Sequence, residues 1–234
     1  MLPFIERLLR PLRRPRVKLS KQAQFEHVSL GTEYGGYAVI PTRLDESSVV
    51  YSFGVGTDIS FDEGLIALRG VTVHAFDPTP RSLEWVKAQT LPKQFVFHPW
   101  GVANYDGSAH FHAPKDPTHV SHTLVESGNV GTGTVEAPVL RLQTIMERLG
   151  HDHIDLLKMD IEGAEYDVLD DLLGSKLAVP QILAEFHHFR SGIPLEKTQR
   201  VVTALEQAGY VAFNASPSGY EFSFVRPDLL PGIS

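Results

Sequence analysis

The sequence predicts an α/β fold in which a mostly parallel sheet is covered by helices on both faces. From residue 49 onward, short apolar segments alternate with amphipathic segments of helix length. Such alternation is typical of parallel strands joined by crossover helices. The chain has 234 residues and is 42% hydrophobic, so it can bury one sizeable core. No internal repeat or interdomain linker interrupts the pattern, and we therefore expect a single domain.

The first half of the alternation contains three expected strands, each rich in β-branched or aromatic residues. The expected elements are, in order, strand 49–55, helix 60–69, strand 71–76, helix 81–89 and strand 95–102. Thr79 is the expected N-cap of the second helix, and Pro80 stands at its first position. Both residue types favour a helix start, because the hydroxyl accepts a free backbone N–H and proline lacks one.

Residues 103–138 interrupt the rhythm. They are rich in Gly, His, Ser and Thr, and "YDGS" is a hairpin-turn signal. We expect a β-hairpin with a long loop near the acceptor site, since long loops in compact domains often act as lids or binding loops. Four histidines crowd this segment: His110, His112, His119 and His122. Their spacing matches no helix-borne metal motif such as HExxH, which disfavours a metal site there.

The alternation then resumes. The expected elements are helix 142–150, strand 154–159, helix 162–173, strand 181–187, helix 194–207 and a closing antiparallel pair at 210–216 and 220–227. Glycines at positions 150, 174 and 209 stand where these helices should end.

The charge distribution divides the chain into two parts. The net charge is −7, but residues 1–22 carry +6 and the remainder carries −13. We take residues 1–30 as a basic N-terminal arm, in which Phe4, Ile5, Leu8 and Leu9 could form one face of a short helix before Pro11. This arm is either a weak anchor for anionic lipid or a partner, or a solvated segment packed on the domain. The acidic remainder argues against a nucleic-acid partner, because phosphate contacts require clustered Lys and Arg.

Cysteine is absent, which excludes disulfides, thiolate nucleophiles and thiolate metal ligands. The absence is compatible with a reducing compartment, and a cytoplasmic location is the simplest expectation. No apolar run approaches the roughly 20 residues that a membrane-spanning helix needs.

Ligands of open α/β sheets bind at the carboxyl ends of the strands, so the residues that follow each strand are the candidates. "SFGVGTD" ends the first strand with Gly54, Gly56 and Asp58, and its glycines allow a sharp turn close to a ligand. The segment is not a complete GxGxxG, which weakens a dinucleotide interpretation. Asp77 ends the second strand 23 residues after Gly54, close to the spacing of an acid that binds a ribose diol.

A family resemblance follows from five segments. "SFGVGTD", "VHAFDPTP", "FHPWGVANYDG", "LLKMDIEGAEYDVL" and "ILAEFHHF" occur in an order and spacing that resemble the FkbM-type methyltransferases. The resemblance covers about residues 30–226, and "KMDIEGAE" is its most specific element.

This resemblance implies S-adenosylmethionine as cofactor and a Rossmann-like, seven-stranded class I methyltransferase fold over residues 31–234. It also implies that Gly54 and Gly56 line the methionine part of the donor. Asp77 would hold the ribose, and Trp100 and Gly101 would border the adenine. The chain departs from the family pattern in having Ser52 in place of an acid and Asp58 in place of a glycine.

Asp160 ends the fourth strand, the position that faces the transferred methyl group in this fold. A carboxylate at the end of a buried strand loses solvation and needs either a partner or a task. We predict that Asp160 orients the acceptor or serves as base. Glu162 and Glu165 are expected in the first turn of the next helix, where the helix dipole favours negative charge.

Glu185, His187 and His188 end the fifth strand. By alternation Glu185 and His187 point to one side, and His188 points to the other. His187 could share a proton with Asp160, because imidazole titrates near neutral pH. Asp160, Glu185 and His187 could instead hold a divalent cation. A hydrogen-bonded acid–histidine pair without metal is the favoured interpretation.

The function predicted from these features is O-methylation of a hydroxyl on a sugar, glycan or natural-product small molecule. Two other classes stay open. One is a non-catalytic module that keeps the fold to bind a glycan or partner, and Ser52 and Asp58 favour it. The other is a nicotinamide oxidoreductase, against which the incomplete GxGxxG counts.

Overall fold

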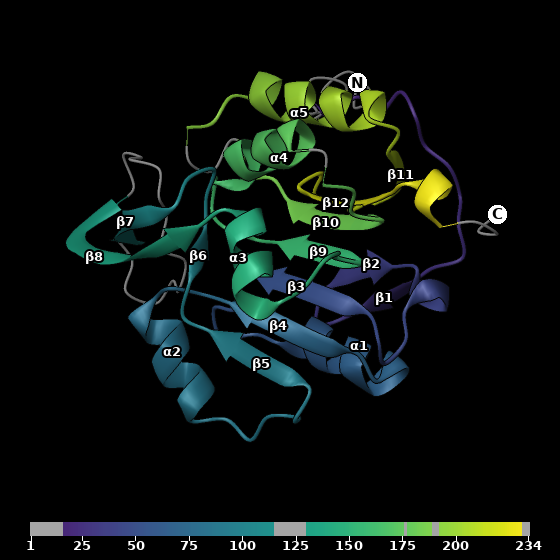
Figure 1. Cartoon of the computed structure of the whole chain (residues 1–234). Coiled ribbons are helices and arrows are strands. Elements are labelled where there is room, and N and C mark those ends of the chain that lie inside the picture. Colours follow the sequence, from purple (N-terminus) through teal and green to yellow (C-terminus); the bar gives the residue numbers. More distant parts are fainter. Residues whose placement is uncertain (1–15, 115–129, 176, 189–191, 231–234) are drawn as a thin grey trace, which may run out of the picture.

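The fold is built on a seven-stranded sheet, described by a computed structural model over residues 16–114, 130–175, 177–188 and 192–230. Its strands are β3 (Val49–Phe53), β4 (Thr72–Phe76), β5 (Phe95–His98), β9 (Leu156–Met159), β10 (Gln181–Glu185), β11 (Val211–Ala215) and β12 (Glu221–Val225). Their order across the sheet is β11-β12-β10-β9-β3-β4-β5 (Figure 1). Neighbouring strands from β10 to β5 run parallel, whereas β12 is antiparallel to both β10 and β11. The predicted mostly parallel sheet with a C-terminal antiparallel pair is confirmed.

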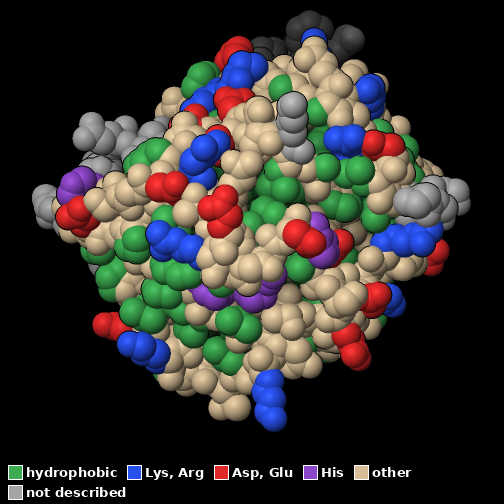
Figure 2. Space-filling model, in the orientation of Figure 1, with side chains coloured by type: hydrophobic (Ala, Val, Ile, Leu, Met, Phe, Trp, Pro, Cys, Tyr) green, Lys and Arg blue, Asp and Glu red, His purple; other side chains and the backbone are tan. Residues whose placement is uncertain are grey.

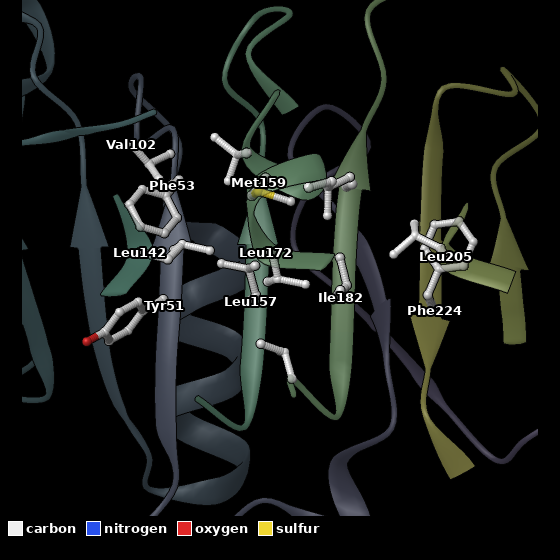
Figure 3. Close-up of a cluster of buried hydrophobic side chains, with 14 of the residues drawn as sticks. Tyr51, Phe53, Val102, Leu142, Leu157, Met159, Leu172, Ile182, Leu205 and Phe224 are labelled. Atoms are coloured by element: carbon white, nitrogen blue, oxygen red, sulfur yellow. The ribbon is translucent and has the colours of Figure 1, made fainter. Parts of the chain in front are cut away.

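Helices cover both faces of this sheet. They are α1 (Ser60–Arg69), α2 (Pro80–Lys87), α3 (Leu142–Leu149), α4 (Glu165–Gly174) and α5 (Leu195–Gln207). Side chains alternate across a strand, so successive residues enter different cores. Val50 belongs to the core that includes α1, and Tyr51 belongs to the core that includes α3 and α4. Figure 3 shows the second core, in which Leu142, Leu172 and Leu205 from α3, α4 and α5 lie against the sheet.

Several predicted boundaries are wrong by one or two residues, and two predicted elements differ by more than that. The strand expected at 95–102 ends at His98, because Pro99 follows and the Trp100 N–H turns back to donate to the His98 carbonyl at 2.9 Å. The helix expected at 162–173 begins only at Glu165. Glu162 has a φ of +52° and Gly163 a φ of +105°, and neither angle is compatible with a right-handed helix. The prediction that Glu162 lies in the first helical turn is therefore wrong.

The expected hairpin within residues 103–138 is present in part. It consists of β7 (Gly107–Pro114) and β8 (Val130–Leu140), which pair antiparallel. A short strand, β6 (Gly101–Val102), pairs parallel with β8, so these three strands form a separate sheet. His119 and His122 lie outside the described residues, as do the other residues of 115–129.

A hairpin that the sequence did not predict precedes the central sheet. It consists of β1 (Val28–Leu30) and β2 (Tyr37–Val39), and β2 packs against β10 and β12. Short 3-10 turns follow at Pro41–Arg43 and Pro227–Leu229. The hairpin and these turns lie with α1 and α2 on one face of the sheet, and α3, α4 and α5 lie on the other face.

The described part of the N-terminal arm packs on the domain. Gln22 forms a bridge with Ala212 in β11, and the buried carboxylate of Glu206 in α5 accepts hydrogen bonds from Ser20 and Lys21. The amphipathic segment around residues 4–9 lies outside the described residues. Among the helices within the described ranges, none is long and apolar enough to cross a membrane. On the face shown in Figure 2, Lys and Arg side chains are interspersed with Asp and Glu.

Candidate active site

A cavity lies at the carboxyl edge of the parallel sheet, as expected for an α/β fold. It contains about 900 Å³ of space that no atom fills, part of it open to solvent. Its walls come from the segments that follow β3, β4 and β9, together with Tyr34 and Gly35 before β2. Three loops that are remote in sequence therefore meet at one site, because parallel strands direct their carboxyl ends to the same edge.

Glycine is needed at the two positions of the first loop for different structural reasons. Gly54 has a φ of +85°, and a Cβ there would lie 1.8 Å from the carbonyl oxygen of Asp160. Gly54 thus allows the ends of β3 and β9 to approach each other. Gly56 also has a positive φ, +52°, but a Cβ there would meet no atom within 4 Å. Only Gly56 therefore keeps open space free at the cavity wall.

Asp77 is buried and holds the first loop in place. One carboxylate oxygen accepts the N–H groups of Val55 (3.1 Å) and Gly56 (3.0 Å) and the Ser82 hydroxyl (2.8 Å). The other accepts both the N–H and the hydroxyl of Thr79. Thr79 in turn caps α2, as the sequence predicted. Asp77 also lines the cavity, but its predicted contact with a ribose would have to share oxygens that already accept five protein donors.

Asp58 also lines the cavity and joins the first loop to the β1–β2 hairpin. Its carboxylate accepts hydrogen bonds from the Ser60 N–H at 2.8 Å and from the Thr32 hydroxyl at 2.6 Å. Burial alone would raise the pKa of Asp58, but these hydrogen bonds and the charge of Lys158 lower it below its usual value. Asp58 therefore carries a negative charge at neutral pH.

Trp100 and Gly101 follow the third strand of the chain, and of these two residues Gly101 lines the cavity. Gly101 lines the cavity with Pro78 and Phe111, whereas Trp100 is not part of the lining formed by the described residues. The Trp100 indole stacks on His98 with ring centroids 5.0 Å apart, on the face that carries α3. The contact predicted between Trp100 and the adenine of the donor stays a prediction.

The acid–histidine cluster lies where β9 and β10 end, and His187 is at its centre. The imidazole is fully buried, and its Nδ1 lies 3.0 Å from Oε1 of Glu165. Its Nε2 faces three more carboxylates, at 3.5 Å from Asp160, 3.5 Å from Glu162 and 3.8 Å from Glu185. Glu185 and His187 thus lie on one side, as alternation predicted.

Ionisation of this cluster follows from its packing. Burial alone would lower the pKa of His187, but the charge and hydrogen bond of Glu165, followed by Glu162 and Asp160, raise it to about 10. Burial raises the pKa of Asp160, against the opposing charges of His187 and Lys158. His187 is therefore a cation at neutral pH in the metal-free chain, and Asp160 is the better proton acceptor of the two.

His188 points away from the cluster. Its Nδ1 lies 3.1 Å from the Thr198 hydroxyl, and its ring lies 5.0 Å from that of Tyr220. Burial lowers the pKa of His188, with a smaller effect from His187. Its side chain therefore contacts Thr198 of α5 and Tyr220, on the other side from His187, as alternation predicted.

Sequence reasoning missed two charged residues of the cavity, Lys158 and Asp62. Lys158 lies within β9, is 5% exposed, and donates to the Gly54 carbonyl at 3.2 Å. Asp62 in α1 is 2% exposed, and burial raises its pKa. Both were detectable: a lysine interrupts the apolar strand "LLKM", and Asp62 shares the helix face of Leu65 and Ile66.

The cavity has a pronounced negative character. Its described lining contains five acidic residues and one lysine: Asp58, Asp62, Asp77, Asp160, Glu162 and Lys158. Such a lining favours ligands that carry positive charge and disfavours anionic groups such as pyrophosphate.

Comparison with known proteins agrees with the resemblance noted from the sequence. The family model of the methyltransferase FkbM domain matches residues 42–212. Probable methyltransferase-like protein 24 of Rattus norvegicus and that of Homo sapiens are each 29% identical over 140 residues, covering 59% of this chain and 32% of the relative. The chain thus spans about a third of the length of these curated relatives.

A solved structure, that of methyltransferase FkbM from Methylobacillus flagellatus KT, is 14% identical with a TM-score of 0.46, covering 78% of this chain and 44% of that chain. The family model matches well over half of the sequence. On that match, this chain belongs to the FkbM methyltransferase family.

Proposed function

We propose that this chain is an S-adenosylmethionine-dependent O-methyltransferase that acts on a hydroxyl of a sugar, glycan or natural-product small molecule. Family membership supports methyl transfer in general. The observed strand order, in which β3 lies between β9 and β4 and β12 runs antiparallel to both of its neighbours, supports the Rossmann-like class I methyltransferase fold that we propose for residues 31–234.

The observation that carries the proposal is the charge of the cavity at the carboxyl edge of the sheet. The donor carries a positive sulfonium and an ammonium group, which suit a lining of five acids and one lysine. A nicotinamide dinucleotide would place its anionic pyrophosphate beside the first loop, where Asp58 is ionised. The same feature therefore disfavours the oxidoreductase alternative.

The donor site that we propose consists of Gly54, Gly56, Asp58, Asp77 and Gly101. Gly56 leaves space at the wall, Asp58 supplies negative charge, and Gly101 forms part of the wall beside Pro78 and Phe111. Asp77 would contribute by fixing the loop and by sharing an oxygen with a ribose hydroxyl. The residues present therefore fit the donor.

The catalytic residues that we propose are Asp160, Glu185 and His187. S-adenosylmethionine supplies a methyl group already activated by its sulfonium, so the protein must orient the acceptor, exclude water and accept a proton. Asp160 borders the cavity and would accept the hydroxyl proton. His187, 3.5 Å from Asp160, would set the charge of that carboxylate, and Glu185 lies 3.8 Å from the same nitrogen of His187.

Calorimetric titration of the chain with S-adenosylmethionine and with S-adenosylhomocysteine tests the proposal. We expect saturable binding of both at one site per chain. The variant Gly56→Leu, which fills the open space at the first loop, should abolish the heat while circular dichroism shows a folded protein. An absence of heat with wild-type protein would contradict the proposal.

A non-catalytic binding module is the second candidate, and one observation favours it. The Asp77 carboxylate already accepts five protein donors, which reduces its capacity to hold a ribose. This alternative predicts no release of S-adenosylhomocysteine with any hydroxylated acceptor. Incubation with a panel of monosaccharides and oligosaccharides, read by mass spectrometry for added methyl groups, separates the two candidates.

A further inference from the structure

One nitrogen atom in the acid–histidine cluster is buried without a hydrogen-bond partner. Nε2 of His187 makes no hydrogen bond, although the imidazole is fully buried. Such an atom costs free energy, so buried polar groups are nearly always satisfied. Nε2 points to the place where the carboxylates of Asp160, Glu162 and Glu185 converge.

The other ring nitrogen is fixed. Nδ1 of His187 lies 3.0 Å from Oε1 of Glu165, and the Glu165 carboxylate also accepts the N–H groups of Ile161 at 2.9 Å and Gly163 at 3.0 Å. A carboxylate that accepts backbone donors is a pure acceptor, so Nδ1 donates to it. This arrangement, in which a carboxylate orients a histidine through one nitrogen and leaves the other for an ion, is typical of metal sites.

The spacing around Nε2 fits a bound ion better than hydrogen bonds. Its separations from Asp160, Glu162 and Glu185 are 3.5, 3.5 and 3.8 Å, all too long for good hydrogen bonds. Two ligand atoms each about 2.1 Å from one ion lie roughly 3.0 to 4.2 Å apart, depending on the angle between them. One atom each of Asp160, Glu185 and His187 lies within 4.8 Å of the others.

We propose that Asp160, Glu185 and His187 bind a divalent cation, with Glu162 beside them as a further oxygen donor and Glu165 as the residue that orients His187. This inference goes beyond methyl transfer, because the site is defined by the protein's own ligands and not by the donor. The ion would balance the negative charge of the carboxylates that converge there. Asp160 and Glu162 also line the cavity, so the ion borders it.

The ligand set selects the class of ion. Mg²⁺ and Ca²⁺ bind oxygen ligands almost exclusively, whereas an imidazole nitrogen combined with carboxylates suits Mn²⁺, Fe²⁺ and Zn²⁺. The absence of cysteine from the chain removes the soft ligands that would select Zn²⁺ strongly. We therefore expect Mn²⁺ to bind more tightly than Mg²⁺.

If the proposed function also holds, the ion has a task in it. A cation beside Asp160 could accept an acceptor oxygen and lower the pKa of its hydroxyl. Acceptors with two neighbouring oxygens, such as vicinal diols, would then be favoured. This extension rests on the proposed function, whereas the cation site does not.

Titration of metal-free protein with Mn²⁺, followed by the loss of the free-ion signal in electron paramagnetic resonance, tests the site. Protein treated with EDTA and then freed of it should bind one Mn²⁺ per chain, and excess Mg²⁺ should displace it poorly. Glu185→Gln should weaken binding by about 10- to 100-fold, and so should Glu165→Gln, which removes the charge that orients His187. The proposal would be overturned if wild-type protein left Mn²⁺ free in this titration and also failed to retain Zn²⁺ in equilibrium dialysis.

A matched control is available in a second acid–histidine cluster. Asp152 lies 2.6 Å from His153 but is 95% exposed, so Asp152→Asn removes a similar pair outside the proposed site. This variant should bind Mn²⁺ like wild type, and an equal loss in Asp152→Asn and Glu185→Gln would contradict the assignment. If Glu185→Gln proves unfolded by circular dichroism, Asp160→Asn supplies the same comparison.

Titration with S-adenosylmethionine in EDTA separates this inference from the proposed function. If the protein binds the donor but not Mn²⁺, only the cation-site proposal is contradicted. Mn²⁺ binding without donor binding supports the cation site and contradicts the methyltransferase proposal.

Discussion

The chemistry of the site is concentrated in a few side chains whose positions depend on their immediate neighbours. His187 is fully buried among carboxylates, and Glu165 holds one of its nitrogens. Asp160 differs from these two, because its side chain remains 33% exposed. Asp160 can thus reach a ligand in the cavity, whereas the buried His187 and Glu165 lie behind it.

Replacement of Asp160 by Asn tests the proton acceptor. The amide keeps the shape of the side chain but cannot take a proton at neutral pH, so turnover should fall by about 100-fold or more. Donor binding should remain, measured by calorimetry beside the rate of S-adenosylhomocysteine release. Asp170→Asn, in an exposed ion pair with Arg200, is the control. Loss of donor binding in Asp160→Asn would mean that its role has been misassigned.

Glu162 adopts a left-handed backbone conformation, with a φ of +52°, beside the cavity. Residues other than glycine prefer to avoid this region by roughly 1 kcal/mol, and such strain is often retained at functional sites. Glu162→Gly should therefore be more stable than Glu162→Ala by about 1 kcal/mol, because both lack the carboxylate and only glycine relieves the backbone. Urea unfolding of the two variants measures the difference, and equal stabilities would argue against strain at this position.

At the scale of the secondary-structure elements, the cavity forms where the ends of neighbouring strands approach each other closely. β3 and β9 are adjacent in the sheet, and their following residues touch where Gly54 meets the Asp160 carbonyl. The loop after β4 contributes Asp77, which binds the first loop and the start of α2 together. Each element therefore supports the site through backbone geometry as well as through its side chains.

Alanine substitutions at the two glycines of the first loop should have different effects. Gly54→Ala places a Cβ against the Asp160 carbonyl and should lower the free energy of unfolding by about 3 kcal/mol or more. Gly56→Ala meets no atom and should cost only about 1 kcal/mol, from its positive φ. Thermal and urea unfolding measure both values. Similar losses in the two variants would mean that backbone conformation, and not the contact with β9, makes Gly54 necessary.

Three histidines between neighbouring elements make stability depend on pH. His74 in β4 lies 3.1 Å from His98 in β5, and its ring packs against that of His151 after α3. Burial, followed by the charges of His151 and His98, lowers the pKa of His74 from 6.5 to about 4. Between pH 6.5 and about 4, His74 therefore binds a proton in the unfolded chain but not in the folded chain.

Stability from this group is complete above pH 6.5 and is lost as the pH falls towards 4, because protonation favours the unfolded state over that interval. His74→Gln should flatten the fall in melting temperature between pH 6.5 and 4 relative to wild type. Differential scanning calorimetry at several pH values measures the slopes. A variant with the wild-type slope would show that other groups cause the loss.

At the scale of the whole molecule, an N-terminal segment is joined to helix α5 far along the chain. The Glu206 carboxylate accepts the N–H groups of Ser20 at 2.6 Å and Lys21 at 2.9 Å, and Ser20 also donates its hydroxyl. Lys18 and Gln199 exchange two further hydrogen bonds. The basic segment therefore contacts the acidic body through defined polar pairs, within the described residues.

Glu206→Gln should lower the free energy of unfolding by about 1 to 2 kcal/mol, because the buried acceptor of these hydrogen bonds loses its charge. Urea unfolding measures the loss. The control Glu147→Gln changes an exposed residue of α3 and should alter stability by less than about 0.5 kcal/mol. A Glu206→Gln variant as stable as the control would show that the N-terminal segment contributes nothing to the fold.

Local sequence patterns predicted the elements well where neighbouring residues alone set their limits. The helix expected at 60–69 has those bounds, and Thr79 caps α2. Patterns failed at Glu162 and at the end of the strand expected at 95–102, where the chain leaves its regular element. The β1–β2 hairpin was missed because its strands have three residues each, too short to show a period.

The sequence by itself determined the mostly parallel sheet, the edge at which the cavity lies and the sidedness of Glu185 and His187, because these follow from local periodicity. Only the tertiary structure decided that Asp77 accepts five protein donors and that Lys158 and Asp62 line the cavity. It also decided that the carboxylates of Asp160, Glu162, Glu165 and Glu185 surround one imidazole. The reason is physical: distances between side chains on different elements depend on how strands pair and turn at their ends, which no short stretch of sequence specifies.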